Sequence, residues 1–191
     1  MPLRAIYRRA LSRSQVALNP THGLELPAPR GKRERIATPA EARALLEALR
    51  PADRPFWATA LYAGLRRGEL LALQWGDVDL EAGVIFVTRS WDPQAGVVET
   101  KSGAGRRRVP LVGLLRRHLA AQRLASGGGG FVFPHPNGGA AKPNAYVDRA
   151  RRDWKAGGLE PILLHECRHT FASMMIAAGV NPKALSTYLG H

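Results

Sequence analysis

The chain has 191 residues, 45% of them hydrophobic and 23% charged, which suits a globular protein of one domain or of one domain with a fragment of a second. Its 28 lysines and arginines against 15 acidic residues give a net charge of +13, which favours a nucleic-acid partner over a basic surface that is merely solvated. The single cysteine, Cys167, excludes an internal disulfide and indicates a reducing compartment, and the lack of a long apolar run or a signal-peptide core predicts a cytoplasmic protein without a membrane span.

Residues 1–37 predict a helix followed by a linker. Within residues 1–18, apolar side chains recur at helical spacing on one face, at Leu3, Ile6, Tyr7 and Ala10. We therefore expect the last helix of an N-terminal domain there. Residues 19–37 are rich in proline and basic side chains, which is typical of a linker. Its Lys32, Arg33 and Arg35 are candidates for contact with nucleic acid, although a solvated linker explains the same charges equally well.

Residues 38–191 predict a mostly helical α+β domain. The run from Thr38 to Glu41 is typical of a helix start, with Thr as N-cap, Pro at the first helical position and Glu at the third. Further helices are expected at about 53–63, 69–73, 111–125, 144–156 and 164–178, with a last one from Asn181-Pro182 to Gly190. Strands are expected at 84–88, 97–100 and 106–109, which would form one small antiparallel three-stranded sheet.

The turn after the helix at 53–63 presents Arg66. Gly64 ends that helix, and Leu65 and neighbouring leucines anchor the turn in the core, so the Arg66 guanidinium is preorganised to grip a phosphate bidentately. Glu69 lies one helical turn away, where it would orient Arg66 or pair with Arg67. A single exposed arginine is more often plain surface, so this segment decides nothing alone.

The predicted hairpin places Lys101 near its tip. A lysine on such a tip can reach into a groove and deliver a proton to a leaving alkoxide. Arg106, Arg107 and Arg108 follow it and are candidates for contact with DNA. The alternative is a hairpin whose lysine only keeps it soluble, which is the commoner case for one lysine.

The pentapeptide from His165 to His169 has two incompatible interpretations. As His-Glu-x-x-His it matches a zinc peptidase, with His165 and His169 as ligands and Glu166 as general base. As His-x-x-Arg it places His165 and Arg168 on one helix face, where they suit a phosphodiester.

Several features argue against a metal site. A third zinc ligand would have to be His135 or His191, neither of which has the spacing of a zinc peptidase, and Arg168 would lie unfavourably close to a dication. Asp77 and Asp79 suggest a carboxylate pair for a nuclease metal, but their place before a strand is more typical of a turn. We therefore expect no metal and keep the zinc peptidase as a remote alternative.

Four segments occur in the order found in the catalytic domain of the tyrosine recombinase, or phage integrase, family. They are Gly-Leu-Arg-Arg-Gly-Glu-Leu at 64–70, Thr-Lys-Ser at 100–102, His-Glu-Cys-Arg-His-Thr-Phe-Ala-Ser at 165–173 and Leu-Gly-His at 189–191. Each segment is weak alone, and their order makes the resemblance specific. Residues 38–191 resemble the catalytic domain, and residues 1–18 resemble the last helix of the family's core-binding domain.

The resemblance implies a role for each matching residue. Arg66 and Arg168 would clamp the scissile phosphate and stabilise its pentacoordinate transition state. Lys101 would be the general acid toward the 5′-oxygen. His165 would assist proton transfer at the nucleophile, and His191 would hydrogen-bond the phosphate.

The resemblance also implies partners and a cellular setting. Glu69 would support Arg66, and the two arginines would replace divalent metals, so no cofactor is expected. The partner would be double-stranded DNA, with a homo-tetramer on DNA in the intact protein. We expect a bacterial or phage-derived protein associated with the nucleoid.

The nucleophile is the one departure from the family pattern. The family's tyrosine follows the Leu-Gly-His motif by a short distance, and this sequence stops at His191. Tyr188 precedes His191 and lies on the apolar stripe of its helix, so we expect it in the core rather than at the reaction. We expect site-specific recombination or integration through a 3′-phosphotyrosyl intermediate, with this chain alone inactive or nearly so. The alternative is an inactive DNA-binding fragment or regulator.

Overall fold

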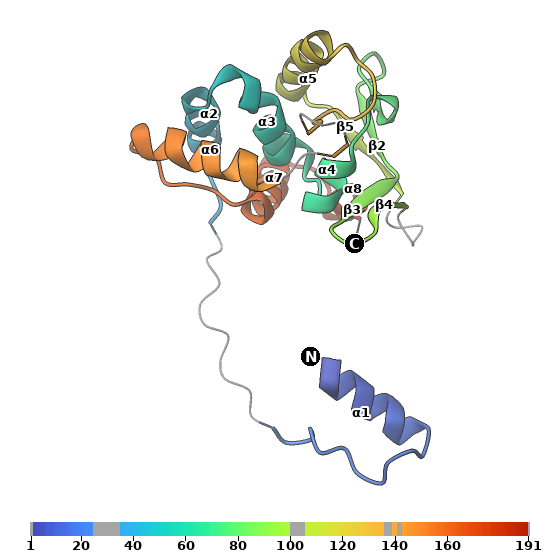
Figure 1. Cartoon of the computed structure of the whole chain (residues 1–191). Helices are drawn as coiled ribbons and strands as arrows, with labels where there is room; N and C mark the ends of the chain where they lie inside the picture. Colours follow the sequence, from blue (N-terminus) through green and yellow to red (C-terminus); the bar gives the residue numbers. More distant parts are fainter. Residues whose placement is uncertain (1, 25–34, 100–105, 136–138, 141–142, 191) are drawn as a thin grey trace. The chain divides into compact units, whose positions relative to one another are not determined.

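The computed structural model describes residues 2–24, 35–99, 106–135, 139–140 and 143–190 (Figure 1). Contacts divide the chain into a unit of residues 1–33 and a unit of residues 34–191. In the first unit, helix α1 (Pro2–Ser12) has no buried residue. Its Leu3, Ile6 and Leu11 are exposed, as the apolar face of a helix without a partner would be.

The second unit is mostly helical, as expected. Its α-helices are α2 (Pro39–Ala48), α3 (Arg54–Ala63), α4 (Arg67–Ala72), α5 (Gly113–Ser126), α6 (Pro143–Ala156), α7 (Leu164–Ala177) and α8 (Pro182–Leu189), with 3-10 turns at Pro51–Asp53 and Trp75–Asp77. Helix α3 packs against α2, α5 and α7 and is buried along most of its length. None of the helices in the described ranges is long and apolar enough to cross a membrane.

Local sequence signals explain where several helices begin and end. At the start of α2, Thr38 Oγ1 accepts the Glu41 N–H at 3.2 Å, and the Glu41 carboxylate accepts the Thr38 N–H at 2.7 Å, which completes the predicted capping box. Helix α3 ends at Gly64, whose φ of 60° is in the left-handed region that glycine tolerates best. Asn181 caps α8 by accepting the Lys183 N–H.

The core around α3 is built from aromatic side chains. Phe56 stacks on Tyr146 with ring centroids 4.1 Å apart, and Trp57 meets the Trp154 ring edge-on at 4.7 Å. Since Tyr146 and Trp154 both belong to α6, this aromatic packing fixes α6 against α3. Trp154 also donates its indole N–H to the Leu45 carbonyl of α2.

The strands form two small antiparallel sheets instead of the single sheet expected. Strands β1 (Val78–Asp79), β2 (Val84–Val87) and β5 (Arg107–Pro110) make a three-stranded sheet in the order β1-β2-β5. Strands β3 (Arg89–Asp92) and β4 (Gly96–Glu99) pair only with each other. The expected strand at 97–100 therefore belongs to this separate hairpin, and β1 supplies the third strand of the main sheet.

The β3–β4 hairpin packs closely on α4, which carries the arginine motif. Gly68 of α4 lies so near to β3 that an added Cβ would be 2.3 Å from Ser90 Oγ and 2.9 Å from the Trp91 carbonyl oxygen. Figure 1 shows α2, α3, α6 and α7 on one side of this unit, and the strands with α4 and α8 on the other. Helices α7 and α8, one from each side, contact each other.

Candidate active site

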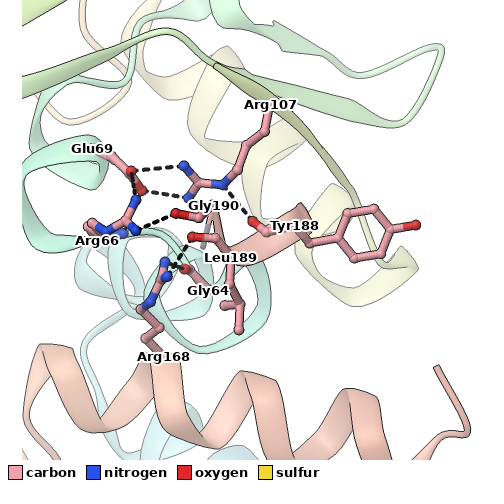
Figure 2. Close-up of polar contacts among 8 residues, drawn as sticks. All are labelled: Gly64, Arg66, Glu69, Arg107, Arg168, Tyr188, Leu189 and Gly190. Atoms are coloured by element: carbon pink, nitrogen blue, oxygen red, sulfur yellow. Dashed lines mark hydrogen bonds and ion pairs between the residues drawn. The ribbon is translucent and has the colours of Figure 1, made fainter. Parts of the chain in front are cut away.

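Arg66 lies at the N-terminal end of α4, immediately after the turn at Gly64. Its backbone N–H donates to Glu69 Oε2 at 2.7 Å and its Nη1 to Glu69 Oε1 at 2.9 Å, while Nη2 donates to the Gly190 carbonyl at 2.7 Å (Figure 2). The side chain is 44% exposed. Glu69 thus fixes both the main chain and the guanidinium of Arg66, and part of that guanidinium still faces solvent.

Arg107 holds Glu69 from the opposite side. Its Nη1 donates to Glu69 Oε1 at 2.8 Å and its Nη2 to Oε2 at 2.7 Å, a bidentate pair in which both side chains are almost fully buried. Burial alone would raise the pKa of Glu69. The hydrogen bonds from Arg107 and Arg66 outweigh that effect, so the pKa is lowered and the carboxylate stays ionised.

Arg168 projects from α7 toward the same place. Its Nη1 donates to the Gly64 carbonyl at 2.6 Å and its Nη2 to the Leu189 carbonyl at 2.5 Å. Burial, reinforced by the nearby Arg66 guanidinium, lowers the pKa of Arg168 to about 10. The Arg168 guanidinium is therefore still a cation at neutral pH. The positive charges of Arg66 and Arg107 nearby disfavour its charged form.

The three arginines converge on the last turn of α8. Arg107 Nε donates to the Tyr188 carbonyl at 2.5 Å, next to the Leu189 carbonyl held by Arg168 and the Gly190 carbonyl held by Arg66 (Figure 2). Carbonyl oxygens at a helix C-terminus lack partners within the helix and lie at the negative end of its dipole. These three carbonyl oxygens therefore occupy hydrogen-bonding positions around the guanidinium groups where the oxygens of an anionic ligand could otherwise bind.

A cavity of about 390 Å³ opens beside these groups and is lined by Arg66, Arg67, His165 and Arg168, among others. His165 is exposed at the start of α7, three residues before Arg168. The structure therefore brings together three of the predicted catalytic residues, Arg66, His165 and Arg168, with Glu69 behind them. Lys101 and His191 lie outside the described residues.

The zinc-peptidase interpretation conflicts with the position of Glu166. This side chain is fully buried, and its carboxylate accepts the Leu163 N–H at 2.8 Å at the start of α7. A general base must instead reach a water molecule beside the two histidines. His165 and His169 are exposed, with ring centroids 6.3 Å apart, and no metal-binding group of three His, Cys, Asp or Glu side chains occurs within the described ranges.

The predicted nuclease pair, Asp77 and Asp79, is also used locally. Asp77 accepts the Gln74 N–H and an Arg89 guanidinium, and Asp79 accepts the N–H groups of Glu81 and Ala82 in the turn before β2. Both carboxylates therefore accept main-chain N–H groups in local turns, as the alternative interpretation predicted.

The predicted DNA-contacting residues differ widely in exposure. Arg106 is exposed and pairs with Glu99, and Arg108 is exposed with its guanidinium 5.3 Å from the Phe86 ring centroid. Arg35 is mostly covered and binds Glu41 and Glu160. Lys32 and Arg33 lie outside the described residues.

Arg107 is the clear correction among them, because it is buried rather than on the surface. Side chains alternate between the two faces of β5, so Arg107 lies on the same inner face as the fully buried Val109. That alternation was visible in the sequence and is the signal that could have identified Arg107 as an inward-facing residue. Its partner Glu69, 38 positions away, gave no such signal.

Tyr188 does not face the arginines through its ring. Figure 2 shows the phenol pointing away from the three guanidinium groups, and only the main-chain carbonyl takes part in the cluster. The side chain is half-buried, so it is less deeply in the core than expected. Its position gives no support for a role as nucleophile.

Comparison with known proteins identifies the class to which this fold and site belong. The family model described as "Phage integrase family" matches residues 35–191, and the chain belongs to that family. It is 31% identical over 176 residues to the prophage integrase IntR of Escherichia coli K12, which covers 79% of this chain and 43% of IntR. It is also 31% identical over 201 residues to the tyrosine recombinase XerC of Xylella fastidiosa 9a5c, covering 98% of this chain and 63% of XerC.

Solved structures show the same fold at lower identity. The Tn1549 transposon integrase in complex with circular intermediate DNA has a TM-score of 0.80 at 22% identity, covering 99% of this chain and 70% of that one. A lambda integrase tetramer bound to a Holliday junction has a TM-score of 0.70 at 20% identity, with 99% and 56% covered. The chain spans less than two thirds of the length of the two curated relatives.

Proposed function

We propose that this chain supplies the phosphate-activating part of a DNA strand-transfer site, in a protein that carries out site-specific recombination or integration. The observation that carries the proposal is the convergence of Arg66, Arg168 and His165 on one cavity in a member of the phage integrase family. Strand cleavage would pass through a 3′-phosphotyrosyl intermediate, and rejoining would reverse that step.

The arginines suit the charge that develops during phosphoryl transfer. Two guanidinium groups can each bind non-bridging oxygens of the scissile phosphate and stabilise the extra negative charge of the pentacoordinate transition state. His165, exposed at the cavity, would assist proton transfer at the nucleophile. Lys101 as general acid and His191 as a hydrogen-bond donor to the phosphate complete the proposal from the family resemblance. No cofactor enters it.

Double-stranded DNA is the proposed partner. The net charge of +13, the exposed Arg106 and Arg108, and the DNA-bound integrases among the structural neighbours support this choice. Lys32 and Arg33 remain candidate contacts from the linker at 19–37, with residues 1–18 as the end of a core-binding domain. By analogy with the lambda integrase tetramer on a Holliday junction, we propose a homo-tetramer on DNA, in the cytoplasm at the nucleoid.

DNA binding without cleavage is the second candidate, and one observation favours it. The Tyr188 phenol points away from the guanidinium groups, so it is not placed to attack a phosphate that they hold.

Strand joining on an activated DNA separates these two candidates without requiring a tyrosine. The substrate is a nicked duplex whose 3′ end carries p-nitrophenyl phosphate and whose facing 5′ end is a free hydroxyl. The 5′-oxygen bonds to phosphorus, the bond to the nitrophenyl oxygen breaks, nitrophenolate leaves with the electron pair, and the hydroxyl proton passes to a base. Randomised sequence around the nick, with sequencing of the joined strands, removes the need to know the target site.

We expect nitrophenolate release and joined DNA with the wild-type chain, both lost in R66A and R168A. Removing one such donor typically lowers the rate by roughly 100- to 1,000-fold. Binding of the duplex with no joining would favour the DNA-binding candidate. Equal joining by wild type, R66A and R168A would overturn the proposed roles of the arginines.

A further inference from the structure

We infer that Arg107 is a positioning residue for the reaction: it holds Glu69 so that Glu69 can orient Arg66 without cancelling its charge. The inference rests on the proposed function, because it concerns the same phosphate site. Arg107 itself has a side chain that is 2% exposed, so it does not touch DNA and acts through its neighbours.

The contacts of Glu69 provide the first argument. Both carboxylate oxygens accept from Arg107, and each also accepts one hydrogen bond from Arg66. A carboxylate with Arg66 as its single cationic partner would form a neutral pair, and a neutral pair has little attraction for phosphate. With Arg107 present, the three side chains carry one net positive charge, and that charge is available at Arg66, the exposed member of the group.

The geometry of Arg107 provides the second argument. Its Nη1 and Nη2 grip the two oxygens of Glu69 side by side, and its Nε donates in the plane of the group to the Tyr188 carbonyl. One rigid guanidinium therefore joins β5, α4 and the end of α8. That end also supplies the carbonyls of Leu189 and Gly190 to Arg168 and Arg66. A lysine cannot reproduce this planar set of donors.

The neighbouring arginine offers a matched control. Arg106 is exposed, pairs with Glu99 at 2.7 Å and lies one position earlier in the chain. A loss at Arg106 should weaken attraction to DNA, whereas a loss at Arg107 should disturb the placement of Arg66. The two changes therefore separate binding from chemistry.

The experiment compares wild type, R107K, R107M and R106M in the strand-joining assay, with the protein in excess over DNA. For R107K we expect the maximal rate to fall by roughly 10- to 100-fold, as for a small misplacement of a reacting group, and the half-saturating concentration to change by less than about twofold. For R106M we expect the reverse pattern. An unchanged maximal rate in R107K, or a change in half-saturation alone, would overturn the inference.

Binding of inorganic phosphate, measured by titration calorimetry, tests the same point without catalysis. We expect a phosphate affinity that depends on Arg66, is weakened by roughly fivefold or more in R107K, and is unchanged in R106M. The double variant E69Q/R107M should recover affinity relative to R107M, because the carboxylate that would neutralise Arg66 is gone. Because both chains carry R107M, the comparison remains informative if that substitution weakens folding.

The two readouts separate the possible failures. If wild type binds phosphate through Arg66 and joins no DNA, the proposed function is wrong, and the phosphate affinity of R107K then decides the role of Arg107. If R107K binds phosphate as tightly as wild type, the role of Arg107 is wrong, whatever the joining assay shows. Absence of Arg66-dependent phosphate binding in wild type would likewise overturn it.

Discussion

The helix starts of α4 and α7 use the same local device, yet they place their glutamates in different settings. In each, the third helical residue is a buried glutamate whose carboxylate accepts the N–H of the residue before the helix: Glu69 from Arg66 at 2.7 Å, and Glu166 from Leu163 at 2.8 Å. Glu69 also receives the guanidinium groups of Arg66 and Arg107. Glu166 Oε1 instead accepts the main-chain N–H of Arg35 at 3.4 Å.

The difference shows how a local signal acquires a role in a site. A glutamate at the third helical position satisfies a free N–H group wherever it occurs. At α4 the same carboxylate also determines where a cation points, because Arg66 precedes the helix and Arg107 lies behind it. At α7 the carboxylate orients the helix, and that helix then presents His165 and Arg168.

The largest predicted contrast is between E69Q and E166Q. Glu69→Gln removes the charge that compensates buried Arg107, and breaking a buried pair in this way typically costs about 3–5 kcal/mol. Glu166→Gln keeps an amide oxygen for the Leu163 N–H and loses the acceptor of the long Arg35 N–H bond, so we expect a loss of about 1–2 kcal/mol. Urea unfolding followed by circular dichroism measures both, and equal losses would break the comparison.

Gly64 connects the two helix starts, and its substitution should have the next largest effect. Its carbonyl accepts Arg168 Nη1, its φ is 60°, and an added Cβ would be 2.3 Å from Phe171 Cδ1. For G64A we expect left-handed strain of about 1–2 kcal/mol together with overpacking of about 1–3 kcal/mol. G127A is the control, with a φ of 74° and no atom within 4 Å of the added Cβ, so it should show the strain alone. Similar unfolding free energies for the two variants would contradict the predicted clash.

The sequence predicted the helix starts but not the ion pair between Arg107 and Glu69. Thr38 with Glu41, Gly64 and Asn181 were all correctly assigned, because caps and helix ends depend on residues a few positions apart. The pairing of Arg107 with Glu69 depends on β5 lying beside α4, which no local pattern encodes. Three consecutive arginines consequently looked alike, although strand alternation turns the middle one inward.

The β3–β4 hairpin was misplaced for a related reason. All four residues of β3 are half-buried, so the strand lacks the alternation of buried and exposed positions by which strands are recognised. The turn between β3 and β4 sets the register of the hairpin, with Asp92 opposite Gly96. What the sequence did not indicate is that the hairpin packs on α4 at Gly68 instead of joining β2 and β5.

Acid sensitivity offers a smaller and more specific test of Glu69. Its pKa is lowered in the folded chain from the ordinary value of 4.5, so its contribution to stability is present above about that pH and is lost as the pH falls through the lower folded value. We expect E69Q to show a shallower loss of unfolding free energy with acidification below 4.5, by at most about 1.4 kcal/mol per pH unit for one proton. Parallel slopes for wild type and E69Q, measured by urea unfolding at several pH values, would show that Glu69 is not held in its ionised form.

Thr38→Ala tests the same helix-start arrangement at α2, where the glutamate pairs with Arg35 rather than with Arg66 and Arg107. Glu41 reaches back to the Thr38 N–H there, as Glu69 and Glu166 reach back at their helices, but it is exposed and does not line the cavity beside Arg168. Thr38→Ala should therefore cost about 1 kcal/mol, the usual value for an N-cap. It should leave phosphate binding and strand joining unchanged. If T38A instead impaired joining as strongly as R107K, helix-start stability alone would explain the effects at α4, and the separate role assigned to Arg107 would not be needed.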